Sequence, residues 1–107
     1  MSQSPINIIA GIIPAFGYES LTVSNSVENL TSAEYTDSDG NRAVKALITI
    51  EGAQIRWRID GTDPAANEGH LSNPFDNIVL NNSSDVRNFK AIRVGLIDAT
   101  IRVTYSA

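Results

Sequence analysis

The stretch QIRWRIDGTDPAANEGH, residues 54–70, decides the fold of this chain. Its hydrophobic side chains Ile55, Trp57 and Ile59 alternate with charged ones, which is the pattern of a β-strand with one buried face. A DGT turn at residues 60–62 then ends the strand. We therefore expect Trp57 to lie in a core between two sheets, together with Ile55 and Ile59.

The same alternation recurs along the chain. It predicts further short strands at residues 21–23, 44–50, 77–80, 89–94 and 100–105. Gly52-Ala53 is a connection short enough to join strand 44–50 to the Trp57 strand as a hairpin. Because short strands alternate with turns and no long helical period occurs, the sequence predicts an all-β fold, an antiparallel β-sandwich or jelly-roll-like small barrel. The sandwich domain is expected at residues 18–107, preceded by an N-terminal apolar arm at residues 1–17.

Composition narrows the classes of function. The 107 residues form one domain, and a hydrophobic fraction of 42% is enough for a core. The absence of cysteine excludes disulfides, thiolate catalysis and cysteine-ligated zinc. A net charge of -4 argues against binding nucleic acid or an anionic membrane, since both need a positive surface.

The apolar stretch INIIAGIIPAF, residues 6–16, has the pattern of neither a membrane span nor a signal peptide. It is too short to cross a bilayer, and Gly11 and Pro14 interrupt it. A signal peptide carries basic residues ahead of its apolar segment, whereas the first basic residue here is Arg42. We therefore expect a protein that is made in the cytoplasm and is not secreted.

Residues suited to catalysis are scarce. His70 is the single histidine, and no nucleophile, zinc-protease or phosphate-loop motif accompanies it. A triad assembled from distant residues stays open, because such triads follow no fixed order along a sequence. The pattern favours a loop histidine bonded to backbone, so neither a catalytic residue nor a cofactor is predicted.

Two clusters of oxygen-bearing side chains could bind calcium: Asp37, Asp39 and Asn41, and Asp60, Asp63 and Glu68. Such residues are also usual in tight turns, where a carboxylate accepts hydrogen bonds from backbone amides. The first cluster departs from an EF-hand loop, because counting from Asp37 places glycine fourth and isoleucine twelfth. Both clusters are interpreted as turns and no metal site is predicted, with calcium at the second cluster as the alternative.

The arginines suggest a surface that is buried against a partner. Of the six arginines, four lie in predicted strands: Arg56, Arg58, Arg93 and Arg102. Arginine is favoured at interfaces because its planar group pairs with two oxygens at once. The alternative is a set of ordinary surface ion pairs, with Glu51, Asp60 or Asp98 as the carboxylates.

The N-terminal arm points in the same direction. Its large apolar side chains are Ile6, Ile8, Ile9, Ile12, Ile13 and Phe16. Unless these fold back onto the domain as an edge strand, they form a large exposed apolar patch, which marks a binding surface. The predicted partner interface therefore consists of these six residues together with Arg56, Arg58 and Arg102.

From residue 20 onward the chain resembles a group of small proteins encoded among the virion genes of tailed bacteriophages. The likeness rests on two segments, EGAQIRWRIDGTDPAANEGH at residues 51–70 and FKAIRVGLIDATIRVTYS at residues 89–106. In that group the first follows the pattern vEgAxIRyRxDGTxPTaxxGh and the second FxaIRxgxxdAtlxVtYs. Ala65 departs from the pattern, since the group commonly has threonine there, and the arm lies outside the likeness.

The resemblance implies a structural protein of the virion rather than an enzyme. Its most direct form is a capsid decoration or cement protein, a homo-oligomer that binds the major capsid protein and stabilises the assembled head. A trimer is one candidate arrangement, and a tail or connector component is a variant of the same class. The alternative from another class is a carbohydrate-binding, receptor-facing module, whose site would need exposed aromatic side chains.

Overall fold

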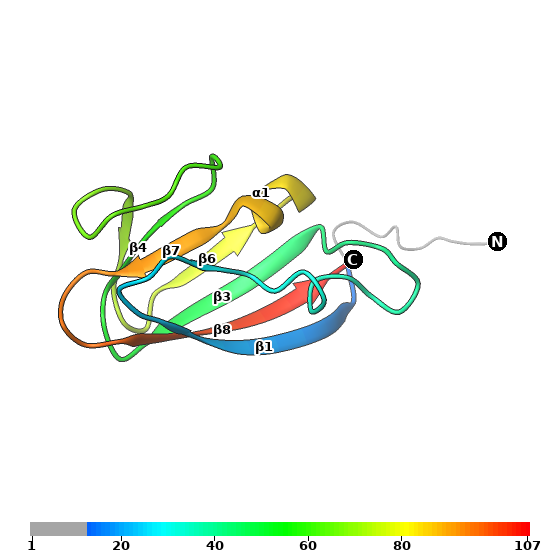
Figure 1. Cartoon of the computed structure of the whole chain (residues 1–107). Helices are drawn as coiled ribbons and strands as arrows, with labels where there is room; N and C mark the ends of the chain where they lie inside the picture. The colour runs from blue at the N-terminus through cyan, green and yellow to red at the C-terminus, as the bar shows by residue number, and fades with distance from the viewer. Residues whose placement is uncertain (1–12) are drawn as a thin grey trace.

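The chain folds into two antiparallel sheets that pack face to face (Figure 1). The computed structural model describes residues 13–107. Sheet A has the strand order β1-β8-β3-β6 and sheet B the order β2-β7-β4-β5. The strands of sheet A are β1 (Ala15–Val23), β8 (Ala99–Ser106), β3 (Lys45–Glu51) and β6 (Asn77–Leu80). Those of sheet B are β2 (Glu28–Asn29), β7 (Lys90–Arg93), β4 (Ile55–Arg58) and β5 (His70–Ser72).

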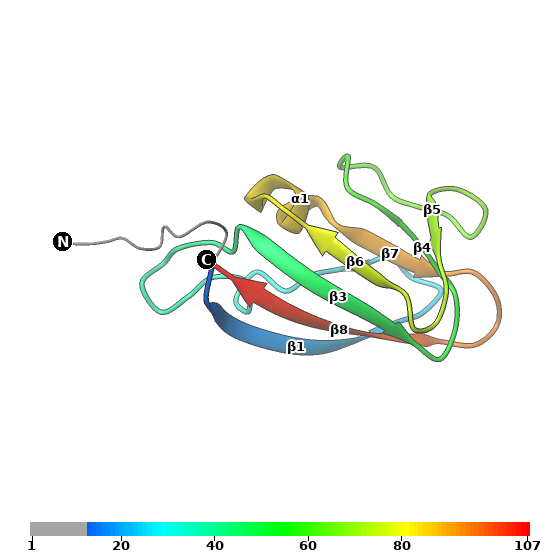
Figure 2. The same cartoon turned by 180° about the vertical axis from the view of Figure 1, so that it is seen from behind.

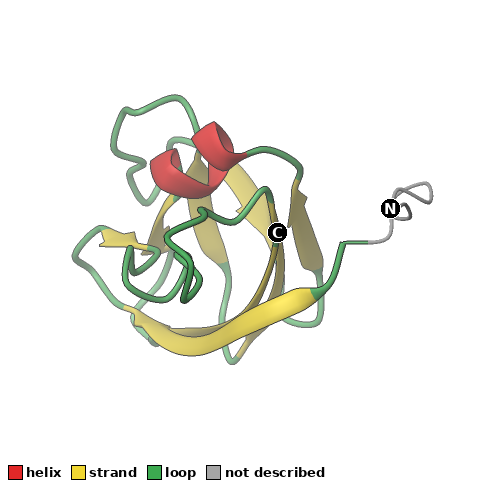
Figure 3. Cartoon of the chain, turned by 90° about the vertical axis from the view of Figure 1, so that its right-hand side faces the viewer, coloured by secondary structure: helices red, strands yellow, loops and turns green. Residues whose placement is uncertain are grey.

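The predicted antiparallel sandwich is confirmed, and the sheets do not close into a barrel. Each sheet keeps two edge strands, β1 and β6 in sheet A and β2 and β5 in sheet B. Figure 3 shows the layers of strands end-on, with the short helix beside them. Alternation produces the shared core: along β8, Ile101, Val103 and Tyr105 are fully buried, whereas Arg102 between them is exposed. The same period along β3 buries Ala46, Ile48 and Ile50.

The connection at residues 52–54 links the two sheets, so the predicted hairpin is wrong. Strand β3 pairs with β6 and β8, whereas β4 pairs with β5 and β7. Gly52 has a φ of 89° at this corner, a left-handed conformation that glycine adopts without strain. Ile50 and Ile55 flank the corner and both are fully buried, so the chain crosses over because both must reach the same core.

Three short elements were not predicted: the strands β2 and β5 and one helix. Strand β5 begins at His70, which the sequence placed in a loop, and it pairs with β4. The helix α1 (Ser83–Asn88) connects β6 to β7 (Figure 2); the Asn82 side chain caps it by accepting the Asp85 N–H at 2.8 Å. Six residues are too few for a helical period to be visible in a sequence. Within the described residues, no helix has the length and apolar character to cross a membrane.

Strand β1 includes the end of the predicted arm. It begins at Ala15 and pairs with β8, so residues 15–17 belong to the sandwich and the predicted boundary after residue 17 lies inside the strand. Phe16 is partly buried against the core, and Ile13 is 37% exposed. The remaining arm isoleucines, Ile6, Ile8, Ile9 and Ile12, lie outside the described residues, and their role stays a prediction.

Trp57 belongs to β4 and lies at the border of the core, opposite His70 of the edge strand β5. Its ring stacks on Phe89, with 5.9 Å between centroids, and contacts His70 at 4.8 Å. Its Nε1 donates a hydrogen bond to Ser72 Oγ at 3.0 Å. Trp57 is partly buried whereas Ile55 is fully buried, so the predicted core position of Trp57 is confirmed in part.

Candidate functional site

The three arginines of the predicted interface lie on opposite faces of the sandwich. Arg102 points outward from sheet A, because its neighbours Ile101 and Val103 are buried in the core. Arg56 and Arg58 belong to β4 and point outward from sheet B. One flat partner surface cannot contact both faces at once, so the predicted interface would need separate contacts on the two sheets.

Arg102 is the centre of a polar network on sheet A. Its Nε donates to Glu51 Oε2 at 2.9 Å, and its Nη1 donates to Ser20 Oγ at 3.0 Å and to Tyr18 Oη at 3.2 Å. The hydrogen bond from Arg102 holds the pKa of the Tyr18 hydroxyl below its ordinary value. Because these groups are exposed, the ion pair with Glu51 adds little stability. The network does connect β1, β8 and β3 on their outer face.

Beside this network, an apolar row crosses the outer face of sheet A. Tyr18, Leu47 and Val79 are 54%, 42% and 44% exposed. The strand register places them, with Thr104, in one line across β1, β8, β3 and β6. Residues opposite one another on adjacent strands lie about 5 Å apart, so the row is continuous. We call Tyr18, Leu47, Val79, Thr104 and Arg102 the sheet A face.

The second acidic cluster forms ion pairs on sheet B. Arg58 Nε donates to Asp60 Oδ1 at 3.0 Å, and Lys90 Nζ lies 3.0 Å from Asp63 Oδ1. The hydrogen bond from Arg58 lowers the pKa of Asp60 to about 2, with help from the Thr62 amide. In the described part of the chain, no group of three or more metal-binding side chains gathers. Asp60 accepts a hydrogen bond within the turn, as the turn interpretation expects. The carboxylates of Asp60 and Asp63 are each paired with a cationic side chain.

The first acidic cluster is also a turn. Asp37 Oδ1 accepts hydrogen bonds from the backbone N–H groups of Asp39, at 3.0 Å, and Asn41, at 2.8 Å. Gly40 follows with a φ of 85°, which suits a tight reversal. The Asp37 carboxylate is therefore occupied by the backbone, and the turn interpretation of this segment is confirmed.

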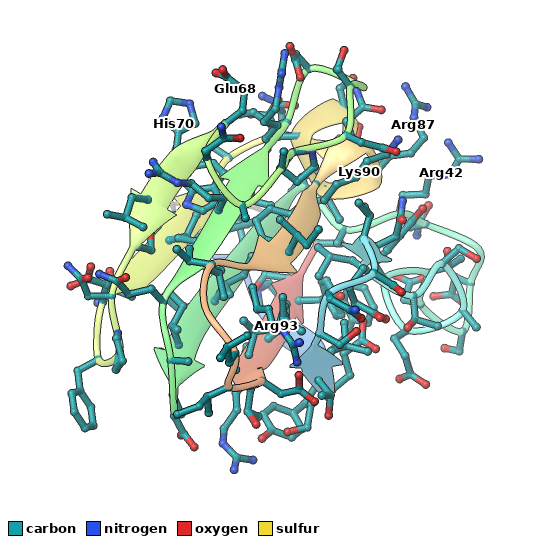
Figure 4. The ribbon with its side chains drawn as sticks, turned by 60° about the vertical axis from the view of Figure 1, so that its left-hand side comes forward. Arg42, Glu68, His70, Arg87, Lys90 and Arg93 are labelled. Carbon is teal, nitrogen blue, oxygen red and sulfur yellow. The ribbon has the colours of Figure 1, made fainter. Side chains whose placement is uncertain are left out.

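Arg56 and Arg93 are held by partners within the chain. Arg56 Nη1 donates to the Gly69 carbonyl at 3.1 Å, and Arg93 forms an ion pair with Asp98, one of the predicted carboxylates. The Nε atoms of both arginines are buried without a hydrogen-bond partner among the described residues. Figure 4 shows Arg93 well away from the edge that carries His70. These two side chains support their own sheet and loops.

A polar hollow of about 350 Å³ lies at the end of β4, lined by Arg58, Ile59, Asp60, Glu68, Gly69 and His70. Glu68 and His70 lie together at this edge (Figure 4). Arg58 and Asp60 pair with each other, and Trp57 packs against Phe89 and His70. A sugar site needs an aromatic face that is free to stack, so this hollow gives little support to a carbohydrate-binding role.

A further apolar cluster was not predicted. Phe75, Leu96 and Ile97 are 90%, 91% and 68% exposed. They lie in the β5–β6 and β7–β8 connections, at the end of the sandwich opposite the C-terminus (Figure 1). Proline and glycine identify both segments as turns; the missed signal was the large apolar side chains inside NPFD and GLID, where polar residues are usual.

Two surfaces therefore stand out on the described chain: the sheet A face and the apolar end formed by the β5–β6 and β7–β8 connections. Both present apolar side chains to solvent, which suits them to contact with another molecule. Comparisons with protein-family models, with curated proteins and with solved structures find no match.

Proposed function

We propose that this chain is a structural protein of a tailed-bacteriophage virion, where it decorates and cements the capsid by binding the major capsid protein. The sheet A face is the observation that carries the proposal. The resemblance of residues 20–107 to small virion proteins supports the choice of class. In this role the protein acts by binding, so no residue is assigned to catalysis.

The sheet A face has the composition of a protein interface. Interface centres are enriched in tyrosine and arginine and combine apolar area with a few oriented polar groups. Here Leu47 and Val79 supply apolar area, while Arg102 and the Tyr18 hydroxyl are already held in place by hydrogen bonds. Side chains that are ordered before binding lose less entropy on association, which strengthens binding.

The N-terminal isoleucines are joined to an edge of this same sheet. Strand β1 is an edge strand of sheet A and begins at Ala15, directly after Ile13 and Pro14. We propose that Ile6, Ile8, Ile9 and Ile12 extend the sheet A contact onto the capsid or onto neighbouring copies in a homo-oligomer, for which a trimer is one arrangement. A protein that binds only the assembled shell stabilises that shell by mass action.

A tail or connector component would use the same surface and differ in its copy number. The carbohydrate-binding alternative has less support, because only two of the chain's seven aromatic side chains, Tyr18 and Phe75, are exposed. They also lie on different parts of the sandwich, in β1 and in the β5–β6 connection, so they do not form one platform.

The test is cosedimentation of the purified chain with heads that lack it, prepared from the phage that encodes it. Leu47→Glu and Val79→Glu each place a carboxylate within the sheet A face, and its desolvation should weaken binding by about tenfold or more. Leu71→Glu is the matched control, because Leu71 is 44% exposed on the outer face of sheet B. Far-ultraviolet circular dichroism confirms that each variant folds. Unchanged binding of the two sheet A variants would refute the proposal.

A further inference from the structure

Phe75 has a conformation and a position that both oppose folding of a single chain. Its φ of 74° lies in the left-handed region, where a bulky side chain is strained. Its side chain is 90% exposed, so it buries almost no apolar area within its own chain. Glycine would suit this backbone better, and a polar residue would suit the solvent better. Contact with another molecule is what remains to account for a phenylalanine here.

Hydrogen bonds fix the turn that presents Phe75. The Asp76 N–H donates to the Asn73 carbonyl at 3.1 Å, which closes the turn, and the Phe75 N–H donates to the Ile50 carbonyl at 2.7 Å. Pro74 at the second position and a positive φ at the third are the features of a type II turn. The backbone of Phe75 is therefore tied to β3, and its ring is presented to solvent in a preorganised orientation.

An apolar hollow of about 300 Å³ lies beside this turn, and its lining includes Ala53, Pro74, Leu96 and Ile97. The lining comes from the β3–β4, β5–β6 and β7–β8 connections, which meet at the same end of the sandwich (Figures 1 and 2). Gly95 contributes only backbone to this lining. A protruding ring and an open apolar hollow thus lie next to each other.

We propose that this end of the sandwich, which we call the tip, joins two copies of the chain, with Phe75 of each copy in the hollow of the other. A knob beside a hole is self-complementary under a two-fold axis. A buried phenylalanine contributes about 150 to 250 Å². With Leu96 and Ile97 of both copies the total is on the order of 1,000 Å², the lower limit for a specific interface, so the dimer is reversible.

Charge at the tip favours a protein over a lipid surface. Among residues 13–107, no basic side chain lines the hollow, and the nearby Asp98 forms an ion pair with Arg93. An anionic membrane would instead be met by free lysine or arginine. The tip and the sheet A face are separate surfaces, so this inference does not depend on the proposed capsid role.

Sedimentation equilibrium of the full chain over a wide concentration range tests the inference. The wild type should show a reversible monomer–dimer equilibrium at micromolar concentration. Phe75→Gly should be monomeric, because it removes the knob, and its melting temperature at low concentration should equal or exceed that of the wild type. Leu96→Ser with Ile97→Ser should also be monomeric, because the double variant removes apolar side chains that line the hollow while Phe75 is retained.

Val44→Ser is the matched control, since Val44 is 40% exposed and lies directly before β3, beside Ser106 at the other end of the sandwich from the tip; it should still dimerise. Three outcomes would overturn the inference. The first is a wild type that stays monomeric at every concentration, which would assign the tip to another partner. The second is a Phe75→Gly variant that still dimerises. The third is a Phe75→Gly variant that melts well below the wild type, which would show that Phe75 stabilises its own chain.

Discussion

Trp57→Ala should lower the free energy of unfolding by about 3 kcal/mol, the low end of the usual range for deleting a core aromatic side chain. Loss of the stack on Phe89 accounts for about 0.5 to 1.5 kcal/mol. The buried Ser72 hydroxyl loses its donor, which costs about 1 kcal/mol. The remainder of the lost free energy comes from the apolar area that the indole no longer buries and from the partly collapsed cavity that it leaves. The total stays at the low end of the range because Trp57 is only partly buried.

The assay is urea denaturation followed by far-ultraviolet circular dichroism, since the variant lacks the chain's single tryptophan. Tyr18→Ala is the control: Tyr18 is 54% exposed on sheet A, so its loss should change stability by less than about 1 kcal/mol. Trp57→Phe keeps an aromatic stack and loses the hydrogen bond to Ser72, so it should fall between the two. A loss below about 1 kcal/mol for Trp57→Ala would refute the reasoning and make the indole available as a ligand platform.

The other predictions concern a buried hydroxyl, an ion pair and the N-terminal segment. Tyr105→Phe should cost about 2 kcal/mol in urea denaturation, because the buried hydroxyl donates to the Glu19 carboxylate; a neutral result would contradict this. The pKa of Asp60 is lowered from 3.8 to about 2, so its stabilising effect is full above about pH 4 and fades as pH falls through 2. The difference in melting temperature between wild type and Asp60→Asn should shrink over that window, and a constant difference would exclude the ion pair as its source. Deletion of residues 1–12 should leave the melting temperature unchanged and weaken cosedimentation with heads; a large fall in melting temperature would instead assign the segment to the sandwich core.

The strands could be predicted because alternation is local. Both β3 and β8 carry buried side chains at every second position, and the sequence displays this directly. Alternation says which side chains face inward but not which sheet a strand joins. The connection at residues 52–54 therefore looks like a hairpin in the sequence. In the structure it joins the two sheets, and Ile50 of sheet A and Ile55 of sheet B are both buried in the core between them. The short elements β2, β5 and α1 have too few residues to show a period.

The candidate surfaces were harder to predict for the same reason. Periodicity directs Arg56 and Arg102 away from the core, but their placement on opposite faces follows only once each strand is assigned to a sheet. The row of Tyr18, Leu47 and Val79 depends on the register between four strands, which single residues do not encode. Phe75 was missed because turns are expected to be polar, and its positive φ is not visible in the sequence.

The most direct test of the capsid role is the copy number of this chain in purified virions, measured by quantitative mass spectrometry against the major capsid protein. A decoration protein bound through the sheet A face should be present in a fixed ratio to the capsid subunits. Leu47→Glu, introduced into the phage genome, should lower that ratio while the protein is still made and folded. Absence of the chain from virions, or a copy number matching the tail rather than the shell, would contradict the account.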